Sequence, residues 1–144
     1  EWTDIIVGLR GEMLSKSIPR YLDESIRPNP QKTDGVSYSR KLAKREGRID
    51  WHKPADVLEH EIRAFADWPK SQTELGGIET IITKAHAGPS TNQPPATIQV
   101  IGKQLIVSTS KGSVIIDSLK PAGKKEMTTE AFLAGYRDKL IDGK

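Results

Sequence analysis

The sequence contains no cysteine and few aromatic residues, and the first absence narrows the chemistry open to the chain. Without cysteine there can be no disulfide and no thiolate ligand for a metal. The three histidines, His52, His60 and His86, lack the paired spacing of a zinc motif, so we expect no metal site. A cysteine-free chain suits a reducing compartment, and we expect a cytoplasmic protein.

Long apolar runs are also missing from the sequence. No stretch approaches the ~20 residues that a membrane-spanning helix needs, so we expect no membrane partner. The 144 residues leave room for one compact domain and a flanking piece. Because the chain begins at Glu1 rather than at methionine, we expect a fragment that starts inside a longer protein.

Motifs for catalysis are absent as well. The sequence has no nucleophile elbow, no P-loop and no glycine-rich dinucleotide fingerprint. Acids and histidines stand singly among bases, without a pair that their spacing would force together. We therefore predict no catalytic residue and no bound cofactor in this chain.

The first thirty residues predict a helix over Asp4–Ser17, because Ile5, Leu9 and Met13 recur at helical spacing. Pro19 should end this helix or open a second short one. The apolar stripe has nothing in its own segment to pack on. We therefore predict that residues 1–30 are the helical tail of a truncated upstream domain, followed by a basic linker over residues 31–48.

Positive charge is concentrated in two places, although the net charge is only +3. Five bases occur within the nine residues 40–48 beside one acid, Glu46, and a second cluster precedes the last helix. Such runs are either solvated segments without further function or surfaces that face phosphates. The candidate phosphate-binding residues are Arg40, Lys41, Lys44, Arg45, Arg48, Lys120, Lys124 and Lys125.

Residues 49–144 predict a small domain that opens with a docking helix from about Pro54 to Ala66. Leu58, Ile62 and Phe65 lie on one face of this helix and should be buried. Two tryptophans bracket it, and we expect both to be core anchors rather than platforms for stacked bases: Trp51 and Trp68.

From Ser71 onward, apolar and polar residues alternate with a period of two, and glycine turns separate the segments. Thr128 should cap a terminal helix through about Leu140. The class is therefore mainly β with flanking helices: a small antiparallel β-barrel preceded by a docking helix, plus an N-terminal helical segment. Aromatic residues are missing from the strands, which favours a folded RNA over a stacked single strand. The expected strands are 73–75, 79–85, 97–101, 104–109 and 113–119.

Four separated motifs in order resemble the methionyl-tRNA formyltransferase family. They are Tyr38–Trp51, Ile62–Phe65 with Trp68-Pro69, Leu119–Met127 and Phe132–Arg137. In that family a Rossmann-like N-terminal domain moves a formyl group from formyl-tetrahydrofolate to methionyl initiator tRNA. An OB-like C-terminal barrel helps to hold the tRNA.

The resemblance implies that residues 49–144 are the OB-like, tRNA-binding C-terminal domain of such an enzyme, and that the eight basic residues contact the tRNA. Formyl-tetrahydrofolate would be the co-substrate of the parent enzyme, and methionyl initiator tRNA the partner of a monomeric chain. The family's catalytic Asn, His and Asp and its Ser-Leu-Leu-Pro folate loop have no counterpart in this sequence. The fragment alone should therefore be inactive.

Three departures from the family pattern concern loops rather than identity. Ala66-Asp67 replaces the usual Asn-Pro, Gln72 replaces an aromatic residue, and Ala96 replaces a glycine. Two alternatives stay open: the C-terminal domain of a sugar-nucleotide formyltransferase, and a non-enzymatic module that binds RNA or protein. The basic clusters argue against the first, because a small sugar needs no such phosphate-facing charge.

Overall fold

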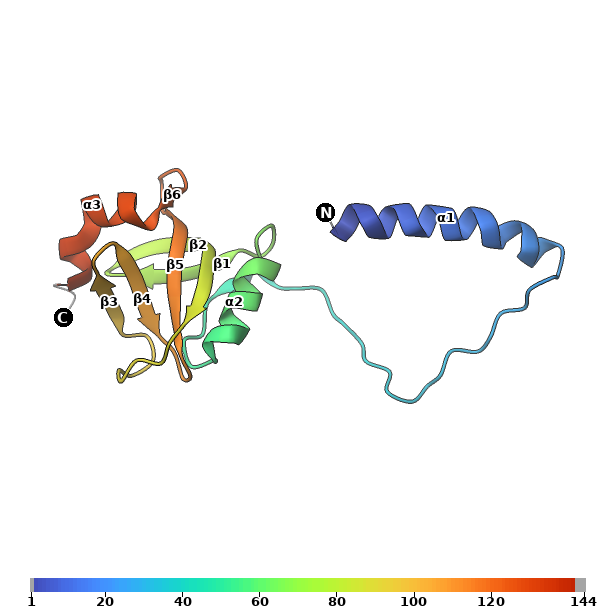
Figure 1. Cartoon of the computed structure of the whole chain (residues 1–144), viewed down its shortest axis with the longest axis horizontal. Helices are drawn as coiled ribbons and strands as arrows, with labels where there is room; N and C mark the ends of the chain where they lie inside the picture. The colour runs from blue at the N-terminus through green and yellow to red at the C-terminus, as the bar shows by residue number, and fades with distance from the viewer. Residues whose placement is uncertain (1, 142–144) are drawn as a thin grey trace. The chain divides into compact units, whose positions relative to one another are not determined.

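The computed structural model describes residues 2–141, and the chain divides into two units that are described separately (Figure 1). The first unit is Glu1–Ser39 and the second is Arg40–Lys144. The division falls inside the predicted linker over residues 31–48, so its basic end belongs to the second unit. Within residues 2–141, no helix combines the length and apolarity that a membrane crossing requires.

The first unit consists of one helix and an extended segment. Helix α1 spans Trp2–Leu22, which confirms the helix expected over Asp4–Ser17. The expectation that Pro19 ends this helix or opens a second one was wrong, because α1 runs on through Pro19 to Leu22. The carbonyl of Ser15, which loses the Pro19 N–H as a partner, lies on an exposed helix where water can hydrogen-bond to it.

The second unit is built on a mainly antiparallel sheet of six strands, which confirms the predicted class. The strand order is β1-β2-β5-β4-β3, and the short β6 pairs with the end of β5. β1 alternates between buried and less buried positions, as a period of two requires, whereas β4 is buried from Leu105 to Ser108. The strands are β1 (Ser71–Leu75), β2 (Ile78–Gly88), β3 (Ile98–Ile101), β4 (Gln104–Ser108), β5 (Ser113–Pro121) and β6 (Met127–Thr128).

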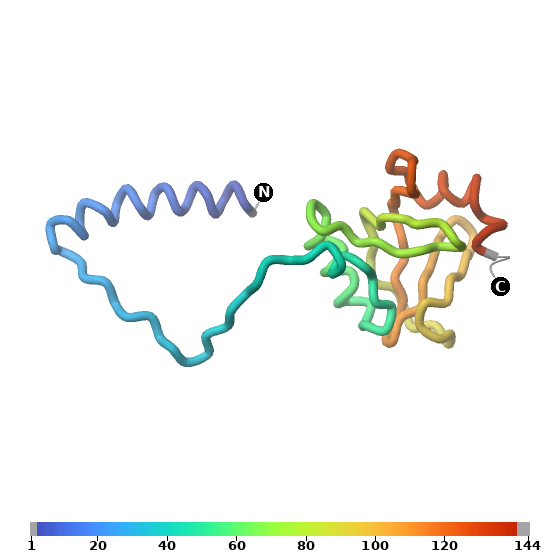
Figure 2. The backbone as a smooth tube through the Cα atoms, turned by 180° about the vertical axis from the view of Figure 1, so that it is seen from behind, coloured from blue at the N-terminus to red at the C-terminus, as the bar shows by residue number. Residues whose placement is uncertain are grey.

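The predicted barrel is not closed by strand pairing within residues 2–141. β1 and β3 form the two ends of the strand order, and helix α3 (Thr129–Ile141) packs against β3. The far end of α3 also reaches the β1–β2 turn, where a Cβ added to Gly76 would lie 2.6 Å from the carbonyl oxygen of Lys139. A helix therefore occupies the place where β1 and β3 would otherwise pair, and Figure 2 shows it from behind.

Three helical segments flank the sheet: the 3-10 helix η1 (Lys44–Gly47), α2 (Ala55–Ala64) and α3. Pro54 is the residue that precedes α2 rather than its first turn, and its fixed φ suits that position. At α3 the predicted cap is confirmed, because the Thr128 hydroxyl accepts a hydrogen bond of 3.3 Å from the backbone N–H of Ala131.

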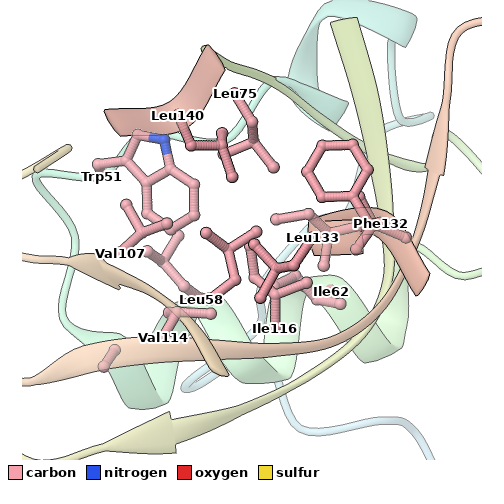
Figure 3. Packing of buried hydrophobic residues seen from close by; sticks show 14 residues of the cluster. Trp51, Leu58, Ile62, Leu75, Val107, Val114, Ile116, Phe132, Leu133 and Leu140 are labelled. Atoms are coloured by element: carbon pink, nitrogen blue, oxygen red, sulfur yellow. The ribbon is translucent and has the colours of Figure 1, made fainter. Parts of the chain in front are cut away.

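The core lies between α2, α3 and the inner face of the sheet (Figure 3). Leu58 and Ile62 of α2 are almost fully buried, as predicted, and the aromatic rings of Trp51 and Phe132 stand at two sides of the aliphatic cluster. Trp51 also donates a hydrogen bond of 3.1 Å from its indole Nε1 to the Thr73 hydroxyl. Its role as a core anchor is confirmed, since both the ring and its one polar atom are accommodated.

Two expected core residues are placed differently. Trp68 is 54% exposed, so its assignment as a core anchor was wrong. It follows the end of α2, and its indole Nε1 lies 3.4 Å from the carbonyl oxygen of Leu42 on the surface. Phe65 is only partly buried, because α2 ends at Ala64 and Phe65 already leaves the helical face that holds Leu58.

Candidate functional site

The basic segment over residues 40–48 is held in a defined conformation by its one acid, Glu46. The Glu46 carboxylate accepts two hydrogen bonds from the Arg40 guanidinium, at 2.6 and 2.8 Å, and one from the backbone N–H of Ala43, at 2.6 Å. The hydrogen bonds from Arg40, and then the one from Ala43, lower the pKa of Glu46 to about 2. Arg40 is therefore already paired within the segment.

The same segment is attached to the edge of the sheet. The backbone N–H of Ile49 donates to the carbonyl oxygen of Gln72 at 2.9 Å, and Arg48 forms a parallel bridge with Gln72. Gly47 is buried so closely that an added Cβ would lie 2.2 Å from the carbonyl oxygen of Lys70. Only glycine allows this approach, so Gly47 fixes η1 beside β1.

Strand register brings a second basic residue to the same edge. Gln72 of β1 pairs with Ile81 of β2, and Ile81 pairs with Lys120 of β5. Residues directly opposite each other in antiparallel strands project from the same face. These three side chains therefore form one row across the outer face, and Glu79 belongs to the neighbouring row with Glu74.

A hollow of about 290 Å³ lies over this row, between η1 and the turn that follows β5. Lys44 and Lys120 contribute the two positive charges among its lining residues, and Glu79 contributes the one negative charge. Arg48 does not line the hollow, but its Nη1 lies 4.0 Å from Oε1 of Glu79. The remaining lining residues are Gln72, Thr80, Ile81, Pro121, Ala122 and Gly123.

The structure thus brings together part of the predicted set. Lys44 and Lys120 both line the hollow although they are far apart in the sequence, and Arg48 lies next to it through its contact with Glu79. Lys124 lies next to the hollow, because its backbone N–H donates a hydrogen bond of 3.0 Å to the carbonyl oxygen of Pro121, which is a lining residue. The other predicted residues do not line the hollow. Arg40 is paired with Glu46. The predicted residues that are exposed away from the hollow are Lys41, Arg45 and Lys125.

The uncharged and acidic residues that line the hollow were not predicted as site residues from the sequence. Gln72 was noted only as a departure from a family pattern, and Glu79 and Ile81 were assigned only to a strand. The alternation along residues 71–75 and 78–82 could have placed Gln72, Glu79 and Ile81 on the outer face. It could not have shown that Lys120 completes the row, since that depends on the register of a distant strand.

Among the titratable residues that the structure describes, His86 and Asp117 form a pair away from this hollow. His86 lies in β2, beyond the strand expected over 79–85, and its Nδ1 lies 3.0 Å from Oδ2 of Asp117 on β5. Both side chains are partly exposed, and neither lines the hollow. Within residues 2–141, no three His, Asp or Glu side chains are grouped so that they could hold a metal ion.

Comparison with known proteins gives consistent matches. Residues 41–137 match the family model described as the C-terminal domain of formyl transferases. The chain is 33% identical over 132 residues to a methionyl-tRNA formyltransferase of Myxococcus xanthus, and 34% identical over 134 residues to that of Methylococcus capsulatus. These alignments cover 92% of the chain but only 42% and 44% of the two relatives.

Solved structures with a similar fold include HypX from Aquifex aeolicus. One variant of that protein matches with a TM-score of 0.62 and 15% identity, over 90% of this chain and 23% of HypX. HypX in complex with tetrahydrofolic acid matches with a TM-score of 0.58 and 16% identity, over 87% of this chain and 22% of HypX. At this level of identity the likeness concerns the fold alone.

Proposed function

Because the chain belongs to the family of formyl transferase C-terminal domains, we propose that it is the tRNA-binding part of a methionyl-tRNA formyltransferase. The parent enzyme would transfer a formyl group from formyl-tetrahydrofolate to methionyl initiator tRNA in translation initiation. The proposed role of this chain is to bind the tRNA as a monomer in the cytoplasm and hold it for the catalytic domain.

The observation that carries this proposal is the meeting of the two basic clusters. Lys44 and Arg48 come from the segment before the domain, and Lys120 and Lys124 come from its other end, yet all four are at or next to one hollow. Charges of one sign gathered from distant parts of a chain attract a polyanion more strongly than scattered charges do. A folded RNA offers phosphates from more than one strand to such a surface.

The other readings of the sequence are less well supported. Three of the curated relatives that match are methionyl-tRNA formyltransferases, which supports that enzyme as the parent protein. A solvated linker without function would not need Gly47 packed against Lys70, nor the Glu46 carboxylate bonded to Arg40 and Ala43. These contacts favour a basic surface with a fixed shape.

The proposal predicts that the isolated chain binds folded initiator tRNA with a steep dependence on salt, because each neutralised phosphate releases condensed counterions. Replacing both Lys44 and Lys120 by Ala should weaken binding and lower the salt slope by about 2, roughly one for each lost phosphate contact. Affinities measured by fluorescence titration at several salt concentrations would test this.

Lys103→Ala provides the matched control. It removes one positive charge where the double variant removes two, and Lys103 lies at the β3–β4 turn, where it is paired with Glu130 at 2.5 Å, away from the hollow. We expect its salt slope to be closer to that of the unaltered chain than to that of the double variant. No binding at low salt, a flat salt series, or equal losses for Lys103→Ala and the double variant would contradict the proposal.

A further inference from the structure

The carboxylate of Glu79 is not expected in a surface that serves only to contact phosphates. It is the single acid among the residues that line the hollow, and it stands between Lys44, Lys120 and Arg48. A carboxylate there repels phosphate groups, and its contact with Arg48 is long, at 4.0 Å. The position of Glu79 therefore points to a ligand that offers hydrogen-bond donors as well as negative charge.

The size and lining of the hollow narrow the class of ligand. At about 290 Å³ it is at the lower end of the roughly 300–1,000 Å³ range of small-molecule sites, so it is roomy for a phosphate and small for a peptide segment. Ile81 and Ala122 provide apolar surface, and the Gln72 side chain provides an amide. An apolar floor with charges of both signs at its edge suits a flat ring that is attached to a sugar and a phosphate.

We propose that this hollow binds one unpaired ribonucleotide of the RNA, an inference that rests on the tRNA-binding function proposed above. Its phosphate lies near Lys44 and Lys120, its base packs on Ile81 and Ala122, and Glu79 accepts a hydrogen bond from the nucleoside. The donor is a ribose hydroxyl or a base N–H group, since both are accessible only when the nucleotide is not stacked in a helix.

The position of Glu79 supports this arrangement. Its backbone carbonyl accepts from the N–H of Ala122 at 2.8 Å, which holds the β2 strand against the turn after β5. The Glu79 carboxylate lies on the outer face with Gln72, Ile81 and Lys120, and so it takes no part in the core. Changing this side chain should therefore alter the hollow without affecting the fold.

The test compares short single-stranded RNAs that differ only in their base, each with a 2′-deoxy version, together with folded initiator tRNA. The unaltered chain should prefer one base, or ribose over deoxyribose, by about tenfold, as expected for a hydrogen bond to a charged group. Glu79→Gln should reduce this preference to about twofold or less. Its affinity for folded tRNA should stay equal or rise, because a negative charge has been removed.

Glu74→Gln is the matched control. Glu74 is paired directly opposite Glu79 in the sheet and is also exposed, but it does not line the hollow. It loses the same charge, so simple electrostatics predicts the same change for both variants. The proposal predicts that only Glu79→Gln loses the preference. Thermal melting of both variants would confirm that they are folded.

Free nucleoside monophosphates separate the two possible sources of the ligand. Competition by one of them at millimolar concentration against the preferred RNA would show that a single nucleotide fills the hollow, and no competition would show that it must be part of an RNA chain. A chain that binds tRNA with steep salt dependence but shows no preference among the RNAs would overturn the nucleotide site alone. Failure to bind tRNA at low salt would overturn the proposed function itself.

Discussion

Ala96 has a backbone φ of 68°, in the left-handed region that favours glycine. A residue with a Cβ is strained by roughly 1–2 kcal/mol in this region. Glycine relieves the strain but lowers the free energy of unfolding by roughly 0.5–1 kcal/mol, because it gives the unfolded chain more conformational freedom. The Ala96 side chain is exposed, so little packing would be lost on its removal. We predict that Ala96→Gly raises the free energy of unfolding by up to about 1 kcal/mol, measured by urea denaturation.

The control for this prediction is Ala134→Gly in α3, which is also exposed but lies within a helix. Glycine there should lower the free energy of unfolding by roughly 1 kcal/mol. The two substitutions remove the same methyl group and are expected to act in opposite directions. Equal destabilisation by both would show that the backbone at Ala96 carries no relievable strain.

The two tryptophans around α2 should differ in their contribution to stability. Trp51 is 9% exposed and bonded to Thr73, so Trp51→Ala should cost roughly 3–5 kcal/mol through a cavity and a lost hydrogen bond. Only about half of the Trp68 surface is buried on folding, so Trp68→Ala should lower the free energy of unfolding by roughly 1–2 kcal/mol. Urea denaturation followed by circular dichroism would measure both, and a Trp51→Ala variant that folds normally but no longer binds tRNA would reverse the assignment.

At the scale of the elements, the conformation of the basic segment over residues 40–48 depends on the contacts of Glu46. The stability of the second unit should therefore depend on pH. The pKa of Glu46 in the folded chain is lowered to about 2 from an ordinary value of 4.5. A lowered pKa means that the stabilisation is complete above about pH 4.5 and is lost as the pH falls through about 2. We predict that the difference in Tm between the unaltered chain and Glu46→Gln is present at neutral pH and disappears towards about pH 2.

The comparison uses Glu12→Gln as its control, because Glu12 pairs with Lys16 inside α1 and belongs to the first unit. That variant should not alter the melting of the second unit at any pH. If the difference between the unaltered chain and Glu46→Gln stayed constant down to about pH 2, the contact with Arg40 would not account for the stabilisation.

The strand elements could be predicted largely from local sequence. Gly102 and Gly112 have positive φ at the β3–β4 and β4–β5 turns, and the apolar run between them placed β4 within a residue of its observed bounds. What could not be predicted depends on contacts between distant residues. The pairing of β6 with β5 and the exposure of Trp68 are of this kind.

The candidate site shows the same division between local and distant information. Counting charges found Lys44, Arg48 and Lys120, because basic clusters are visible in any sequence. Their meeting at one hollow depends on the Arg48–Gln72 bridge and on the Ile81–Lys120 register. The pairing of Arg40 with Glu46 also depends on the turn between them, and the composition of the segment did not reveal it.

For the molecule as a whole, the question is how much of a formyltransferase reaction this chain could perform. It spans about two fifths of the length of the curated relatives it matches. Formyl transfer needs an amine that acts as the nucleophile, a base, and donors that stabilise the tetrahedral intermediate. The polar groups at the hollow include two lysines, one carboxylate and an amide, and the catalytic Asn, His and Asp of the family have no counterpart in this sequence.

We therefore predict that the chain transfers no formyl group when it is mixed with formyl-tetrahydrofolate and methionyl-tRNA. Added to a full-length methionyl-tRNA formyltransferase, it should instead inhibit by competing for tRNA. This inhibition should fade as salt is raised, because the proposed contacts are with phosphates. The Lys44→Ala/Lys120→Ala variant should inhibit less than Lys103→Ala. The measurement is the yield of formyl-methionyl-tRNA, and turnover by the chain alone above a protein-free control would place catalytic residues within these 144 positions.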